Sequence, residues 1–229
     1  MKKNTWLVVF FIALAADLVF IYLNNETWRY VSKPLVTISL IVYFISQVTN
    51  IDSPLKKWVV SALIFSCLGD IFLLFQNDNR FFLFGLSAFL LAHLMYIFFF
   101  HQVRIIERLR GKAWLLLPIA IYYAFIITLL SPYLDDMKIP VRIYAVVISF
   151  MFMLALHMLY TSNKRAGRFM AGGAFMFIVS DSLLALDKYK VYDLPDTVIM
   201  LTYALAQFLI VFGAADYIRS AEKQLEAEV

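Results

Sequence analysis

Three aspartates stand inside apolar stretches of this chain, and each follows a small residue. Asp70 lies in CLGDIFLLF, Asp181 in IVSDSLLAL and Asp17 in AADLVF. Two carboxyl groups that meet at one site can share acid-base work, because a protonated carboxyl donates a proton while an ionised one orients water or stabilises a cation. The stretches around Asp70 and Asp181 are the more alike, so we take this pair as the candidate catalytic residues.

The segments that carry these acids are apolar enough to cross a membrane. Hydrophobic residues make up 63% of the 229 residues, against about half in a soluble domain, and a helix needs about 20 apolar residues to span the hydrocarbon core. We therefore predict an all-α, polytopic membrane protein in which residues 1–229 form a single bundle of eight transmembrane helices. The predicted helices lie near residues 5–23, 32–48, 57–75, 81–100, 113–131, 140–160, 169–186 and 195–218.

Lys and Arg residues are distributed unevenly over the predicted loops. Most of the 20 lie at the two ends of the chain and in alternate loops, such as RIIERLRGK, which share one side of the membrane. The positive-inside rule then predicts that both termini are cytoplasmic, in what we expect to be the inner membrane of a bacterium. Because this asymmetry accounts for the net charge of +4, we expect membrane lipids and no nucleic acid as partners.

The three aspartates are predicted to lie at a similar depth in the membrane. On this topology their helices run in the same direction, and a rise of 1.5 Å per residue places each acid about 18 to 20 Å from the cytoplasmic end of its helix. A carboxylate at such depth costs several kcal/mol unless it is neutral, paired or next to water. We therefore expect the acids to face the interior of the bundle, and for Asp17 a catalytic and a structural role stay equally open.

Other polar residues in the apolar segments form candidate supporting groups. His93 and Tyr96 are three residues apart, and Tyr203 and Gln207 are four apart, so each pair lies on one face of its helix. These side chains either bind substrate or hold the bundle together through hydrogen bonds between helices. Lys33 either reaches a carboxylate or extends to the lipid headgroups. The candidate supporting residues are Asp17, Lys33, His93, Tyr96, Ser180, Tyr203 and Gln207.

The order of these motifs along the chain resembles the YhhN family of lysoplasmalogenases. The resemblance extends over nearly the whole sequence and rests on the motif order, since no single motif is specific. The matching features are Lys33-Pro34 at the start of the second predicted helix, GDIFLL at the end of the third, His93 with Tyr96, SDSLLAL at the end of the seventh, and YALAQ at 203–207.

This resemblance implies an eight-helix membrane hydrolase that cleaves the vinyl ether bond of lysoplasmalogens. The products would be a fatty aldehyde and glycerophosphoethanolamine or glycerophosphocholine. The presumed catalytic aspartates of the family correspond to Asp70 and Asp181, and Asp17 and Lys33 correspond less directly to supporting polar residues.

The chemistry of vinyl ether hydrolysis fits a pair of carboxyl groups without a metal or a cofactor. The reaction begins with protonation of a carbon atom and continues with the capture of an oxocarbenium ion by water, so one carboxyl must be protonated and the other ionised. The apolar surroundings of Asp70 favour it as the acid, and the serines beside Asp181 favour that residue as the base, but the opposite assignment stays open. The three histidines form a poor metal-ligand set, and no G-x-S-x-G nucleophile motif is present.

A second interpretation belongs to a different class of protein. The two similar Asp motifs lie on helices four spans apart, which also fits a duplicated unit in a proton-coupled transporter or a lipid-binding bundle. The sequences that flank the two motifs match poorly, which favours the hydrolase.

Overall fold

The chain folds as a bundle of α-helices, as the apolar segments predict. The structure, a computed structural model, describes residues 5–75 and 78–227. Short 3₁₀ turns flank α5 and α6, and the described residues contain no β-strand. The α-helices are α1 (Thr5–Tyr22), α2 (Glu26–Val48), α3 (Lys56–Leu73), α4 (Asn79–Ile106), α5 (Leu116–Leu130), α6 (Lys138–His157), α7 (Lys164–Lys188) and α8 (Asp196–Ala227).

Most of these helices are suited to a lipid environment. Seven helical segments in the described part of the chain are long and apolar enough to cross a membrane. The segment α3 is not among them, and its 18 residues include three charged side chains, Lys56, Lys57 and Asp70. The protein is therefore a multi-pass membrane protein, and the count of eight spans remains a prediction.

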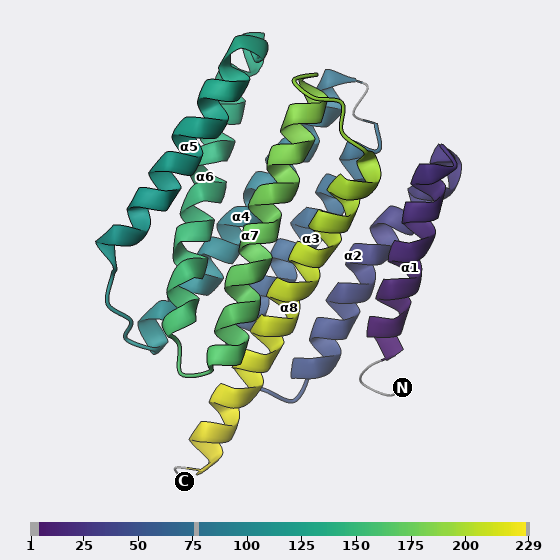
Figure 1. Cartoon of the computed structure of the whole chain (residues 1–229). Coiled ribbons are helices and arrows are strands. Elements are labelled where there is room, and N and C mark those ends of the chain that lie inside the picture. The colour runs from purple at the N-terminus through teal and green to yellow at the C-terminus, as the bar shows by residue number, and fades with distance from the viewer. Residues whose placement is uncertain (1–4, 76–77, 228–229) are drawn as a thin grey trace.

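The helices run side by side and form a flattened bundle with both chain termini at the same end (Figure 1). Consecutive helices pair as α1 with α2, α3 with α4, and α7 with α8, and α2 also packs on α3 and α8. The helix α5 lies at one edge and packs mainly on α6. Its side chains Leu117, Ile121 and Phe125 are each more than 60% exposed, as expected for a surface that contacts lipid.

Two close helix contacts hold the acid-bearing helices in place. A Cβ atom on Gly69 of α3 would lie 2.6 Å from the ring of Phe89 on α4, and one on Gly173 of α7 would lie 2.7 Å from the backbone nitrogen of Ile210 on α8. Neither position has room for a side chain, so the absence of one lets the helices approach closely. These contacts lie on the helices that carry Asp70 and Asp181.

The start of α2 differs from its predicted position more than the start of any other helix does. The helix begins at Glu26 instead of residue 32, because the side chain of Asn25 caps it by accepting a hydrogen bond from the backbone nitrogen of Trp28 at 3.4 Å. The prediction that Lys33 and Pro34 open this helix is therefore wrong, and Pro34 lies in its interior. The added turns extend the polar face of α2 toward the end of the bundle that is opposite the termini.

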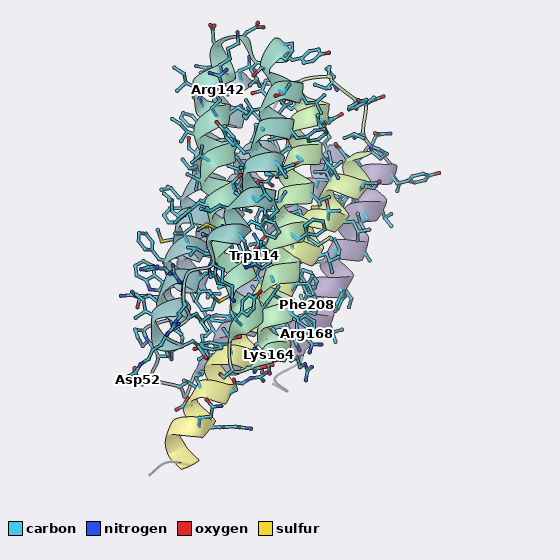
Figure 2. All side chains as sticks on the ribbon, turned by 60° about the vertical axis from the view of Figure 1, so that its left-hand side comes forward. Asp52, Trp114, Arg142, Lys164, Arg168 and Phe208 are labelled. Atoms are coloured by element: carbon cyan, nitrogen blue, oxygen red, sulfur yellow. The ribbon has the colours of Figure 1, made fainter. Side chains whose placement is uncertain are left out.

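The distribution of charge along the bundle gives a test of the topology. Lys164 and Arg168 lie toward the end that holds the termini, and Arg142 lies at the opposite end (Figure 2). In a background in which the single cysteine Cys67 is replaced by Ser, we expect a membrane-impermeant thiol reagent to label Asp193→Cys in intact cells. We expect Gly111→Cys to be labelled only after the cells are opened, because the positive-inside rule places that loop in the cytoplasm. The reverse labelling pattern would contradict the orientation.

Candidate active site

A polar cavity of about 230 Å³ lies at the end of the bundle opposite the termini. Its walls come from α2, α3, α4, α7 and α8. The carboxyl-bearing residues Asp70 and Asp181 both line this cavity, although they are far apart in the sequence. The cavity also contains Lys33, Ser180 and Tyr203, three of the supporting residues that the sequence indicated. It is the place in the described structure where the two candidate acids meet.

The carboxylate of Asp70 is held by two hydroxyl groups. Its Oδ2 atom accepts hydrogen bonds from Thr37 of α2 at 2.6 Å and from Tyr203 of α8 at 2.7 Å. Asp70 is almost fully buried, and Lys33 attracts it electrostatically. Hydroxyl donors and a nearby cation stabilise a carboxylate, whereas burial favours the neutral carboxyl, so both influences act on Asp70.

A second layer of hydrogen bonds positions Tyr203. Gln207, one turn further along α8, lies 3.4 Å from the hydroxyl of Tyr203 and donates to Ser66 of α3 at 2.8 Å. Tyr96 of α4 donates to the side-chain oxygen of Gln207 at 2.7 Å. Tyr96 and Gln207 do not line the cavity. Their hydrogen bonds link α3, α4 and α8 and so fix the position of Tyr203.

Asp181 has different neighbours from Asp70. Tyr144 of α6 donates a hydrogen bond to its Oδ2 atom, and Nε2 of His93 lies 3.8 Å from the same oxygen. His93 is fully buried, and among the described residues its Nε2 atom has no hydrogen-bond partner. Ser180 precedes Asp181 and donates to the carbonyl of Ile199 at 3.2 Å, which links α7 to α8.

Asp17 lies behind the cavity wall instead of lining it. Its Oδ1 atom accepts a hydrogen bond from Ser32 at 2.6 Å and lies 3.9 Å from Nε of Arg29. Arg29 does line the cavity, and its NH1 atom lies 3.7 Å from Oδ2 of Asp196 at the start of α8. Asp17 therefore helps to position Arg29 in the cavity wall. This contact favours a supporting role for Asp17 over a catalytic one.

The pairing of Asp17 with Arg29 predicts a coupled loss of stability. Arg29→Met should lower the thermal unfolding temperature in detergent, because it leaves the buried carboxylate without its cation, a loss of about 3 to 5 kcal/mol. Adding Asp17→Asn should recover part of that loss, since the buried group is then neutral. The control is Arg80→Met, which removes an exposed cation paired with Asp78 and should leave the unfolding temperature unchanged. Additive losses in the double variant would contradict the coupling.

Several residues in or next to the site were not anticipated from the sequence. Thr37 and Arg29 lie on the face of α2 that also carries Lys33, at intervals of four residues. This polar stripe is recognisable once α2 is extended to Glu26, so the error in the helix start concealed it. Tyr144 gave no signal, because it is one of 13 tyrosines and lies in an apolar segment.

The chain is similar to known proteins over most of its length. The model of the YhhN family matches residues 28–214, a range that contains Asp70 and Asp181 but not Asp17. A lysoplasmalogenase of Mycobacterium bovis is 32% identical over 162 residues, covering 69% of this chain and 60% of that protein. Lysoplasmalogenase TMEM86B of Rattus norvegicus is 30% identical over 219 residues, covering 93% of this chain and 85% of the relative.

A further relative is lysoplasmalogenase TMEM86A of Bos taurus. It is 32% identical over 168 residues, which cover 71% of this chain and 67% of the relative. The match covers 60% of the length of the mycobacterial relative, which is less than two thirds. It covers 85% of the length of the rat relative. No solved structure is significantly similar to this chain.

Proposed function

Because the chain belongs to the YhhN family, we propose that it is a membrane hydrolase that cleaves the vinyl ether bond of lysoplasmalogens. The observation that carries this proposal is the meeting of Asp70 and Asp181 in one polar cavity within an otherwise apolar bundle. Relatives from bacteria and mammals are named lysoplasmalogenase, and two carboxyl groups suit the chemistry that this name describes.

The reaction needs one carboxyl as a proton donor and the other as a base. The donor transfers its proton to the outer carbon of the vinyl group, whose π electrons form the new C–H bond, and the ether oxygen shares a lone pair with the inner carbon. This gives an oxocarbenium ion, which the ionised carboxylate stabilises while it takes a proton from the attacking water. The hemiacetal that forms then breaks into a fatty aldehyde and the glycerol hydroxyl.

The cavity also suits the polar part of such a substrate. Arg29 and Lys33 line it together with the acids Glu26 and Asp196 near the ends of α2 and α8. Cations pair with the phosphate of a lysophospholipid, and carboxylates pair with the amino group of its headgroup. We propose that the glycerophosphoethanolamine or glycerophosphocholine part of the substrate lies on this side of the cavity.

The membrane arrangement that accompanies this function is also a proposal. We propose eight membrane spans, with α3 crossing beside its partner α4, and cytoplasmic termini in a bacterial inner membrane. On this topology the cavity opens near the non-cytoplasmic face, because it lies at the end of the bundle opposite the termini.

The proposed activity is tested by the products of the purified protein in detergent. Incubation with a lysoplasmalogen should release a fatty aldehyde, whereas the matched saturated ether lipid should stay intact because it has no double bond to protonate. The matched acyl lysophospholipid serves as a second control. Release of fatty acid from it would indicate an ester hydrolase, and a lack of aldehyde from lysoplasmalogen would reject the proposal.

A further inference from the structure

A smaller apolar cavity lies beside the polar one, between α4, α6 and α7. It has a volume of about 40 Å³, and side chains such as Phe82, Val141 and Ala185 form its walls. Of the described acidic residues, Asp181 is the one that lines both cavities. The residues shared by the two cavities are Leu73, Phe89, Asp181 and Leu184.

We propose that this apolar cavity binds the first carbons of the alkenyl chain of the substrate, and that Asp181 is the group that protonates the vinyl ether. The inference rests on the proposed function. A vinyl ether joins the polar glycerophosphate of the lipid to its apolar chain, and Asp181 stands where the polar cavity meets the apolar one. With the glycerophosphate in the polar cavity and the alkenyl chain in the apolar cavity, the vinyl ether bond between them lies at Asp181.

The order of atoms in the substrate then separates the roles of the two acids. Of the two vinyl carbons, the outer one is attached to the chain and takes the proton, and the inner one is attached to oxygen and takes the water. With the chain in the apolar cavity, the outer carbon lies at Asp181 and the inner carbon faces the polar cavity, which Asp70 also lines. This is the reverse of the assignment that the apolar sequence around Asp70 favoured.

The hydrogen bonds of the two acids support this division. Tyr144 and His93 both face Oδ2 of Asp181, which leaves its Oδ1 atom to carry the proton. Asp70 accepts hydrogen bonds from Thr37 and Tyr203 on one oxygen, and those two donors suit a carboxylate. Asp70 is thus equipped to stabilise the oxocarbenium ion and to take a proton from water.

The steps balance without another reactant. Asp181 gives its proton to the outer carbon, and Asp70 gains a proton as the oxygen of water bonds to the inner carbon. When the hemiacetal breaks, its hydroxyl proton passes to Asp181, and Asp70 returns its proton to the departing glycerol oxygen. Both acids regain their starting states, and one water molecule is consumed for each aldehyde released.

The chain site is tested by narrowing the apolar cavity. Ala185→Leu adds bulk to its wall and should lower the ratio of kcat/KM for a lysoplasmalogen to that for an analogue whose alkenyl group ends at the outer vinyl carbon by about tenfold or more. The matched control is Ala221→Leu, which fills a hollow at the other end of the bundle and should leave the ratio unchanged. An unchanged ratio in Ala185→Leu would overturn the chain site.

Cross-linking tests the same site in the unaltered protein and requires no turnover. A saturated ether lysophospholipid with a diazirine near the start of its chain should label the walls formed by Val141, Leu184 and Ala185. Labelling confined to the groove between α1 and α2, where Val9 and Leu35 lie, would overturn the proposal. If the wild type releases no aldehyde, the proposed function fails, and the cross-linking map still decides whether the cavity holds the chain.

The role of Asp181 is tested with a cationic mimic of the oxocarbenium ion, a lysophospholipid analogue in which an ammonium group replaces the ether oxygen. Asn resembles a protonated Asp, so Asp181→Asn should change the affinity for this mimic by only a few-fold. Asp70→Asn removes the stabilising negative charge and should weaken binding by about a hundredfold or more, while the neutral saturated ether lipid binds both variants alike. The opposite pattern would assign the proton donor to Asp70.

Discussion

Asp70→Asn and Asp181→Asn should each lower the turnover of lysoplasmalogen by about a hundredfold or more while the bundle stays folded. Asn keeps the shape of Asp and an oxygen that can accept the existing hydrogen bonds from Thr37, Tyr203 and Tyr144. It can neither donate an acidic proton nor accept one from water, so the loss should appear in kcat. Aldehyde release measures the rate, and the thermal unfolding temperature shows that the fold is retained.

A matched control for this experiment lies on the same helix as Asp181. Asp187 is an α7 acid outside the cavity, where it accepts a hydrogen bond from the backbone of Leu194, and Asp187→Asn should retain near-normal turnover. If Asp70 and Asp181 act on one reaction, the double variant should be far less impaired than the product of the single losses. Near-normal turnover in either single variant would remove that acid from the mechanism.

Turnover in heavy water should place one deuterium on the α carbon of the released aldehyde. The reason is that the proposed donor exchanges its proton with solvent and delivers it to the outer vinyl carbon, which becomes the α carbon of the product. The rate should also fall in heavy water, because the transferred proton contributes to the barrier. Mass spectrometry of promptly trapped aldehyde measures the label before later exchange can add to it.

The labelling experiment separates vinyl ether protonation from other routes. Aldehyde added to the protein in heavy water is the control for exchange after release, and it should gain little deuterium over the same interval. The residual aldehyde from Asp70→Asn should still carry the label, because the proposed proton donor Asp181 is intact in that variant. Freshly released aldehyde without α deuterium would show that neither carboxyl protonates the substrate at carbon.

The amino-acid sequence by itself determined the class of fold and selected Asp70 and Asp181 as the candidate catalytic acids. Apolar segments of spanning length must bury their backbone polar groups in helices, so the helix order follows from composition and length. An acid in such a segment is costly unless it faces a polar interior, which is why Asp70 and Asp181 could be selected before any contact was known. Asp17 met the same criterion, and the weaker likeness of its motif left its role open between catalysis and structure.

Only the tertiary structure decided how the acids differ, because their neighbours come from distant helices. Asp17 is paired with Arg29 behind the wall, whereas Asp70 and Asp181 face the cavity. The cap at Asn25 extended α2 and brought a polar stripe to the site. Tyr144 reaches Asp181 from α6, beside an apolar cavity that several helices form together. The side chains that become neighbours across a bundle depend on how the helix faces pack. A local stretch of sequence does not determine that packing.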